Sequence, residues 1–286
     1  MGLTLRQGIP EDAETCGHIC YEAFSAIAAE HRFPSNVPSA EAGVGLVSAQ
    51  LNHSNIYSVV AEVDGKVVGS NFLDERSTVF GVGPITVDPT TQNQGLGRAL
   101  MLDVMRRAAD RGAAGVRLIQ AGYHNRSLSL YAKLGFRARD LLACMQGPPP
   151  KEEIPGYHVR RATEADVPAC AALCRNVHGH DRAGEVSDAI AQGTALVVEH
   201  DKRISGYATD LAFFAHAVGE SNEDLKALIT AADTFEGTGI LVPVTNAELF
   251  EWCLHRGLHV VQTMTLMSTG GLYTSPEGAY LPSVIF

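Results

Sequence analysis

The stretch VGPITVDPTTQNQGLGRALMLDVMRRA, residues 82–108, decides how this sequence folds. It starts with apolar residues that end at Val87-Asp88-Pro89, crosses a polar loop, and arrives at Gly95-Leu96-Gly97. After the first of these glycines, apolar residues recur at helical spacing, at positions 96, 100, 104 and 108. The pattern predicts a strand over about 79–88 and a long helix over about 95–111.

The start of that predicted helix has the properties of an anion-binding site. The first turn of a helix has unpaired N–H groups and the positive end of the macrodipole, and glycine lets the backbone approach a ligand closely. A pyrophosphate would fit such a cradle, and Arg98 could add a cation. A plain loop remains the alternative. A dinucleotide fingerprint is disfavoured, because Leu100 stands where its third glycine is needed and a hairpin precedes the loop.

The elements around this stretch predict a layered α+β or mixed α/β domain. Antiparallel strands come first, and later strands alternate with helices, so the sheet is expected to be mixed, mostly antiparallel and flanked by helices. The remaining predicted elements are a strand at about 3–7, helices at about 11–31 and 39–52, a hairpin at about 56–75, a strand at about 115–121, a helix at about 125–134 and a strand at about 136–145.

The chain also repeats itself. LRQGIPEDAETCGHIC, which contains Arg6, is echoed by VRRATEADVPACAALC, which contains Arg160, at a constant shift (160 − 6 = 154, 174 − 20 = 154). Two hairpin patterns, ending at Gly69 and Gly206, form a second echo. We therefore predict two tandem copies of one fold, at residues 1–147 and 157–286, joined by a proline-rich linker at 148–156.

Two motifs resemble the GNAT superfamily of acetyl-CoA-dependent N-acyltransferases. Gln92-Asn93-Gln94-Gly95-Leu96-Gly97 matches its Q/R-x-x-G-x-G/A signature. Asn125-Arg126-Ser127-Leu128-Ser129-Leu130-Tyr131-Ala132-Lys133-Leu134-Gly135-Phe136 is similar to its N-x-x-A-x-x-x-Y-x-x-x-G-F stretch, with serine at or near the usual alanine. The resemblance implies an enzyme that moves an acetyl group from acetyl-CoA to a primary amine of a small molecule or peptide by direct attack. The alternative is a non-catalytic sensor that binds acyl-CoA or an amine.

The resemblance also implies roles for individual residues. Backbone amides of the Gln92–Gly97 loop, together with Arg98, would hold the pyrophosphate of the cofactor. The strand Ile85-Thr86-Val87 would pair with the pantetheine arm and polarise the thioester carbonyl. Asn125 and Ser127 would lie near the pantetheine or its phosphates. Tyr131 would protonate the departing thiolate, because a phenol keeps its proton at neutral pH.

The general base that deprotonates the amine is expected at the end of the second hairpin strand. Asp74 and Glu75 are the candidates, and only one of them can face the cleft because adjacent strand residues point to opposite faces. The alternative is a solvated hairpin end. Asp74, Tyr21 and Glu22 are also candidates for lining the amine pocket.

The second copy has lost the motifs. Where the glycine loop should be, it has HAVGESNEDLKALITAA, residues 216–232, whose acidic residues would stabilise a helix start and repel a pyrophosphate. Cys253 stands where Tyr131 stands in the first copy (135 − 131 = 4, 257 − 253 = 4). We predict that the second copy does not bind acetyl-CoA productively, and that it either closes the amine pocket or only stabilises the chain.

Composition excludes several classes of protein. The chain has 286 residues, 45% hydrophobic residues and a net charge of −10, which argues against a nucleic-acid partner. No apolar run is long enough to span a membrane, and the start lacks a signal pattern, so we expect a cytoplasmic monomer or homodimer. The six cysteines are expected to be buried, not to bind a metal, and His178-Gly179-His180-Asp181 is expected to be a solvated loop.

Overall fold

The computed structural model describes residues 2–270 and 276–285. Contacts between Cα atoms divide the chain into two compact units. Of the described residues, the first unit contains 2–75 and 79–118 together with Ile285, and the second contains 76–78, 119–270 and 276–284. The two units are defined by contacts within the fold and not by the sequence repeat. The boundary expected at 148–156 therefore stays a prediction. Each unit is a mixed α/β structure, as the sequence predicted.

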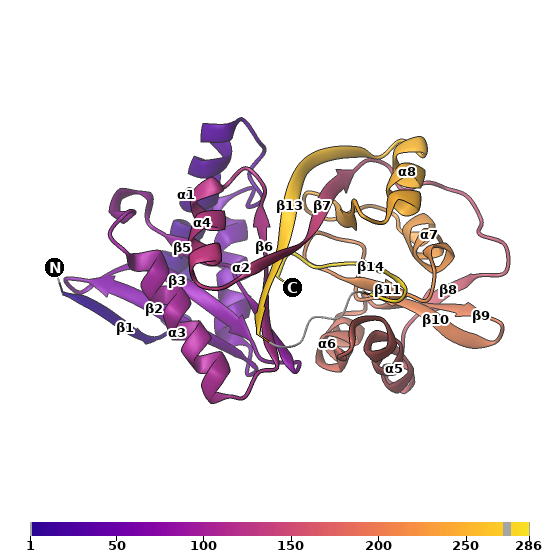
Figure 1. Cartoon of the computed structure of the whole chain (residues 1–286), viewed down its shortest axis with the longest axis horizontal. Coiled ribbons are helices and arrows are strands. Elements are labelled where there is room, and N and C mark those ends of the chain that lie inside the picture. The colour runs from indigo at the N-terminus through magenta and orange to yellow at the C-terminus, as the bar shows by residue number, and fades with distance from the viewer. Residues whose placement is uncertain (1, 271–275, 286) are drawn as a thin grey trace. The chain divides into compact units, whose positions relative to one another are not determined.

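The first unit is built on one sheet with the strand order β1-β2-β3-β4-β6 (Figure 1). The first three strands pair antiparallel, and β4 pairs parallel with β6. Strand β5 also pairs with β3, at Gly69↔Val87 and Ser70↔Thr86. The strands are β1 (Leu3–Gln7), β2 (Ile56–Val63), β3 (Lys66–Asp74), β4 (Val79–Val82), β5 (Thr86–Val87) and β6 (Gly115–Ala121), whose last residues belong to the second unit.

Helices cover both faces of this first sheet (Figure 1). On one face, the Asn71 side chain of β3 donates to the carbonyl oxygen of Leu100 in α3 at 3.4 Å. On the other, Phe72 packs with Cys16 and Cys20 of α1. Consecutive side chains of β3 thus point to opposite faces of the sheet, one covered by α3 and the other by α1. The helices are α1 (Ala13–His31), α2 (Ala40–Asn52) and α3 (Leu96–Asp110), and short 3-10 turns lie at Pro10–Asp12 and Pro89–Thr91.

The strand expected at 79–88 is interrupted. A cis Gly83-Pro84 peptide separates β4 from β5, and Gly83 has a φ of 137°. Before this break, the strand pairs in parallel with β6 as far as Gly81↔Arg117. After it, β5 keeps the antiparallel pairing with β3 but has no pairing with β6 among the described residues. The expectation of one continuous strand was wrong, because a proline placed after a left-handed glycine changes the direction of the chain.

In the second unit, β7 pairs antiparallel with two strands from much later in the chain, β13 on one side and β12 on the other. A second sheet has the order β14-β11-β10-β9-β8. The strands are β7 (Arg137–Gln146), β8 (His158–Arg161), β9 (Leu196–His200), β10 (Arg203–Ala208), β11 (Ala217–Gly219), β12 (Ile240–Pro243), β13 (His259–Gly270) and β14 (Ala279–Leu281). The helices are α4 (Asn125–Lys133), α5 (Val167–His178), α6 (Ala183–Gln192), α7 (Asn222–Ala231) and α8 (Ala247–His255), and a 3-10 turn lies at Glu164–Asp166.

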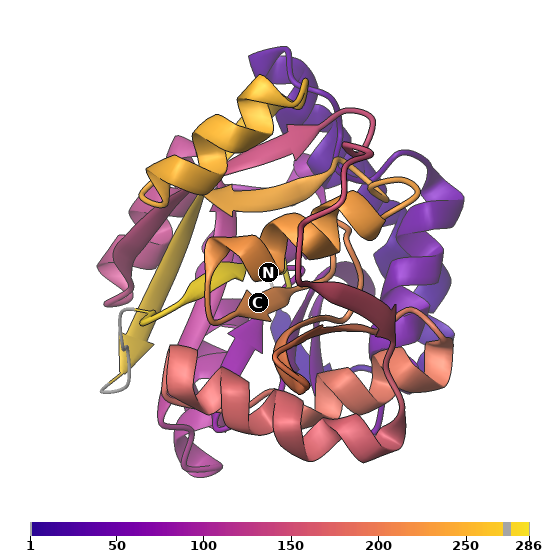
Figure 2. The same cartoon turned by 90° about the vertical axis from the view of Figure 1, so that its right-hand side faces the viewer.

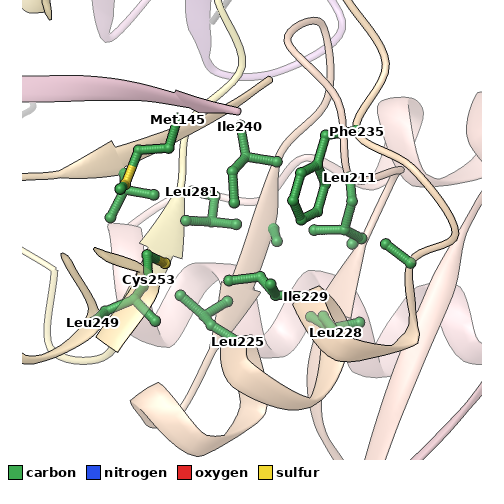
Figure 3. Close-up of a cluster of buried hydrophobic side chains, with 14 of the residues drawn as sticks. Met145, Leu211, Leu225, Leu228, Ile229, Phe235, Ile240, Leu249, Cys253 and Leu281 are labelled. Atoms are coloured by element: carbon green, nitrogen blue, oxygen red, sulfur yellow. The ribbon is translucent and has the colours of Figure 1, made fainter. Parts of the chain in front are cut away.

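The second sheet has a helix layer on each face (Figure 2). Val197 packs with residues of α5 and α6, whereas its neighbour Val198 packs with residues of α7. Figure 3 shows the larger of these two cores, in which Leu225 of α7, Ile240 of β12 and Leu281 of β14 meet. The chain end near Leu281 is therefore packed.

The sequence repeat is accompanied by a repeated ion pair. Arg6 makes a two-pronged ion pair with Asp12, and Arg160 makes the same pair with Asp166, with all N···O distances between 2.7 and 2.9 Å. The guanidinium of Arg160 holds the pKa of Asp166 well below its usual range. All six cysteines are free and buried, which confirms their expected burial. In the described parts of the chain, no helix combines the length and apolar character needed to cross a bilayer.

Candidate functional site

The loop between β5 and α3 is fixed by hydrogen bonds within itself. The Asp88 carboxylate accepts from the amide and the hydroxyl of Thr90 at 2.8 and 2.7 Å. The Gln92 side-chain amide donates to the carbonyl oxygen of Val87 at 3.1 Å. The loop therefore arrives at α3 in a defined conformation, with no need for a ligand to order it.

The start of α3 is open to solvent. Its N-cap is Gly95, which has a φ of 83° and no side chain that could accept from the first amides. A Cβ on Gly95 would have no heavy atom within 4 Å. The amide of Ala99 donates to the Gly95 carbonyl at 3.0 Å, so the amides of residues 96–98 precede the first turn of helical hydrogen bonds. Asn93, Gln94, Gly95 and Arg98 are exposed, whereas Leu96 is buried.

Strand β5 has one edge available. It pairs with β3, and this is its only strand partner among the described residues. A Cβ on Gly69 of β3 would lie 2.5 Å from the Thr86 carbonyl, so the close approach of the two strands requires glycine there. The Thr86 side chain is 4% exposed, and its hydroxyl has no hydrogen-bond partner in the described chain. Ile85 and Val87 are half-buried beside it.

The two candidate bases have different environments. Glu75 accepts from Arg107 of α3 at 2.6 Å and lies 3.3 Å from Arg111, with its side chain 8% exposed. Asp74 lies two residues after Phe72 in β3, so its side chain points to the same face of the sheet as Phe72. That face is the one covered by α1. The hairpin end is thus not simply solvated: Glu75 is tied to α3, which leaves Asp74 as the better candidate for a base.

The two candidate pocket residues on α1 also differ. Tyr21 packs against the core cluster of α1, and its Cβ would lie 3.3 Å from a Cβ placed on Gly43 of α2. Glu22 is exposed. Tyr21 therefore sits at the contact of α1 with α2, while Glu22 faces solvent, and their role in an amine pocket stays a prediction.

Helix α4 carries the second motif, within the second unit. Asn125 is its first residue and is exposed. The imidazole of His124 caps the helix by accepting from the Ser127 amide at 3.2 Å. This cap was missed from the sequence, although a polar residue just before a helix is the usual signal for one.

Tyr131 lies on the buried side of α4, with 6% of its side chain exposed. Burial raises the pKa of its phenol to about 12, although a hydrogen bond with the Ser127 side chain opposes the shift. The phenol is therefore protonated throughout the neutral range and is suited to donate a proton. Its ring lies 6.1 Å from that of Phe136, centroid to centroid.

Comparison with known proteins assigns the family. Residues 54–138, which include the loop, β5, α3 and Tyr131, match a family model described as an acetyltransferase (GNAT) domain. This segment of the chain belongs to the GNAT superfamily. A candidate acetyltransferase from Pyrococcus horikoshii has the same fold, with a TM-score of 0.76 at 16% identity over 98% of this chain and 94% of that one. A GCN5-related N-acetyltransferase from Sphaerobacter thermophilus aligns with a TM-score of 0.61 at 15% identity over 96% and 98%.

Relatives with higher sequence identity match only part of this chain. A mycothiol acetyltransferase from Thermomonospora curvata is 35% identical over 92 residues, which is 32% of this chain and 31% of that protein. A mycothiol acetyltransferase from Kytococcus sedentarius is 36% identical over 87 residues, which is 30% and 29%. The matched segment thus spans about a third of the length of these relatives.

The second copy has a closed helix start. Ser221 caps α7, and the Asp224 carboxylate accepts from the Ser221 amide at 2.9 Å and from its hydroxyl at 2.8 Å. Asp224 is 1% exposed. Asn222 and Asn246, at the starts of α7 and α8, exchange side-chain hydrogen bonds of 3.1 and 2.7 Å. The predicted internal capping of this helix is confirmed.

The remaining candidate reactive or metal-binding side chains of the second copy, Cys253, His178 and His180, are buried. Cys253 is completely buried, and its carbonyl accepts from Leu258 at 3.1 Å just as that of Tyr131 accepts from Phe136 at 3.0 Å. His178 and His180 are 8% and 3% exposed, so the expectation of a solvated loop was wrong. In the described chain, no three His, Cys, Asp or Glu side chains are grouped as metal ligands would be.

Proposed function

We propose that this protein transfers an acetyl group from acetyl-CoA to a primary amine by direct attack of the amine on the thioester. The observation that carries the proposal is the helix start at Gly95, which is open, uncapped and preceded by a strand with an available edge. Each of these features suits one part of the cofactor: the amides suit the pyrophosphate, and the strand edge suits the amide-bearing pantetheine arm.

The proposed cofactor contacts follow from that arrangement. The amides of the loop Gln92–Gly97 hold the pyrophosphate, and the exposed guanidinium of Arg98 adds a positive charge. The backbone of Ile85-Thr86-Val87 pairs with the pantetheine arm. An N–H of this strand also donates to the thioester oxygen, where negative charge develops during attack. Asn125 and Ser127 bind further along the cofactor, by the resemblance of their motif.

The proton balance assigns the two catalytic residues. The amine nitrogen forms a bond to the thioester carbonyl carbon, and the carbon–sulfur bond breaks as the tetrahedral species collapses. The amine loses a proton to Asp74, directly or through water, and the departing thiolate takes a proton from the Tyr131 phenol. The raised pKa of Tyr131 keeps that proton available at any pH at which the amine can react.

A small-molecule acceptor is favoured over a peptide. Two curated relatives are named mycothiol acetyltransferases, after a small molecule. The net charge of −10 is compatible with a cationic amine. The charge is supporting evidence only, because net charge describes the whole surface and not the pocket.

The proposal is tested by titrating the protein with coenzyme A in a calorimeter and by following free thiol release with a panel of amines. We expect saturable coenzyme A binding and amine-dependent thiol release. Binding without release on any amine would instead support the sensor. The Tyr131→Phe variant should bind coenzyme A as the parent does and turn over about 100-fold more slowly. A parent-like rate would remove Tyr131 from the mechanism.

The two carboxylates form a matched pair for testing the base. Asp74→Asn should lower turnover by about 100-fold at neutral pH and leave the melting temperature nearly unchanged. Glu75→Gln should lower the melting temperature, because it weakens the buried ion pair with Arg107, while turnover changes little. The reverse pattern would move the role of base to Glu75.

A further inference from the structure

The second copy contains a strand that corresponds to β5 of the first. In the first copy, Gly69 and Ser70 of β3 pair with Val87 and Thr86 of β5. In the second, Gly206 and Tyr207 of β10 pair with Gly219 and Val218 of β11. The two glycines end the repeated hairpin patterns, so Gly219 corresponds to Val87 (219 − 87 = 132) and Val218 to Thr86 (218 − 86 = 132). Strand β11 is thus the second copy of the strand proposed to bind pantetheine.

The other edge of β11 is occupied by the chain itself. Strand β14 pairs with it antiparallel, with the register Gly219↔Ala279, Val218↔Tyr280 and Ala217↔Leu281. Strand β14 also contacts β12, which corresponds to the end of β6 in the first copy. Residues 279–281 therefore lie between β11 and β12, along the edge that is available in β5.

This segment is packed as tightly as the core around it. Ala279 and Leu281 are each 2% exposed and belong to the large core of the second unit, where Figure 3 shows Leu281 among the side chains of α7 and β12. A Cβ on Gly278 would lie 2.5 Å from the carbonyl oxygen of Gly219. The amide of Glu277 donates to the Val177 carbonyl at 3.3 Å, and the Tyr280 hydroxyl donates to Asp140 at 2.8 Å.

We propose that residues 277–281 are a built-in occupant of the second copy's cofactor groove, in the place of the pantetheine arm. Asp224 plays the corresponding part for the pyrophosphate. Its carboxylate accepts hydrogen bonds from the amide and hydroxyl of Ser221 at the helix start, where a pyrophosphate would sit. The second copy is therefore a GNAT fold whose groove is filled in cis by strand addition. The analogy with the pantetheine arm rests on the proposed function, whereas the strand pairing does not.

Hydrogen exchange on the intact protein tests the occupant directly. The amides of residues 279–281 should exchange at least about 100-fold more slowly than those of the exposed hairpin turn at Asp64-Gly65, and in step with the amides of β11. Exchange as fast as in that turn would overturn the proposal. This measurement needs no variant and does not depend on coenzyme A.

The number of coenzyme A molecules bound tests the consequence. We expect one per chain, at the first copy. Two per chain would overturn the inference, because the second groove would then be open. None would overturn the proposed function, and the exchange experiment would still decide the inference.

A pair of variants tests the packing. Gly278→Val should lower the melting temperature of the full chain by several degrees and speed exchange in β11, because its Cβ has no room beside Gly219. Glu277→Val places the same side chain one residue earlier, at an exposed position, and should leave both unchanged. Equal effects of the two substitutions would contradict a tightly seated occupant.

Discussion

Helices α3 and α7 start at corresponding places in the two copies and end up with opposite chemistry. Each helix follows a strand that pairs with the second strand of a hairpin. In each, a charged residue lies three positions after the N-cap residue (98 − 95 = 3, 224 − 221 = 3). In α3 the cap is Gly95 and the third helical residue is Arg98. In α7 the cap is Ser221 and the third helical residue is Asp224.

The difference shows that one helix dipole can be used in two ways. The positive end of α7 is neutralised by a carboxylate of its own chain, which lies 1% exposed and also accepts from the Ser205 hydroxyl. The positive end of α3 is left exposed, and such an end attracts an anion from solution. An internal cap thus closes the start of α7, where the start of α3 is open.

The largest effect should come from placing a carboxylate at the open helix. Gly95→Glu puts a negative charge where the phosphates would bind and forces a non-glycine residue into a φ of 83°. We expect coenzyme A affinity, measured by calorimetry, to fall at least about 100-fold, which is about 2.7 kcal/mol.

Gly112→Glu is the matched control for this substitution. Gly112 follows the other end of α3 and has a φ of 71°, and a Cβ added there would likewise meet no heavy atom within 4 Å. The backbone strain is therefore similar while the cradle is untouched, and coenzyme A should bind as in the parent. If both variants lost binding equally, strain and not the cradle would explain the loss.

Acid should destabilise the second copy more than the first. Burial, helped by Arg182, lowers the pKa of His216 to about 4, and its imidazole lies 3.0 Å from the Tyr207 hydroxyl and 3.4 Å from Glu185. Pro84 occupies the corresponding place in the first copy (216 − 84 = 132), so the first copy has no histidine there.

The sign follows from proton uptake by the unfolded chain. An unfolded histidine titrates near pH ~6.5, so between that pH and about 4 the unfolded state binds a proton that the folded state does not. The stability that neutral His216 contributes is present above pH ~6.5 and falls by at most about 3 kcal/mol on acidification to pH 4. Denaturant unfolding followed across this pH range measures it. Titration of the His216 ring near pH 6.5 in NMR spectra of the folded protein would contradict it.

Removal of the internal cap should cost stability without changing cofactor binding. Asp224→Ala leaves the Ser221 amide and the Ser205 hydroxyl without their acceptor, so we expect a loss of about 2 kcal/mol in the free energy of unfolding. Glu223→Ala is the control, because Glu223 is one residue earlier and makes only a partly exposed pair with Lys226, worth about 0.5 kcal/mol. If Asp224→Ala weakened coenzyme A binding at the first copy, the two helix starts would not be independent.

Much of the contrast between the copies could be predicted from the sequence, because it depends on local patterns. The apolar spacing after Leu96 placed α3, and the acidic residues after Gly219 indicated an internally capped helix. The constant shift between Arg6 and Arg160 predicted the repeat, within which the structure places the same ion pair twice, with Asp12 and with Asp166. Signals of this kind lie within a few residues of one another, and local chemistry determines them.

Features that depend on distant partners were not visible in the sequence. Nothing near Glu75 shows that its carboxylate is held by Arg107, 32 residues later. The pairing of β7 with β12 and β13, and of β14 with β11, joins segments whose own sequences would suit several partners. For the same reason, the sequence does not show that residues 279–281 lie against β11.

The smallest effect should come from the charge of Arg98, the counterpart of Asp224. Its side chain is exposed, so its attraction for a pyrophosphate is screened by solvent. Arg98→Ala should weaken coenzyme A binding about 3- to 10-fold at low ionic strength, and by less in ~0.5 M salt. Lys66→Ala removes the same charge from the exposed start of β3 in the same unit and should change nothing. The size of the Arg98 effect is itself diagnostic. A loss comparable to that of Gly95→Glu would mean that the guanidinium, and not the row of amides, holds the phosphates, and the contrast between α3 and α7 would then reduce to one exchanged charge.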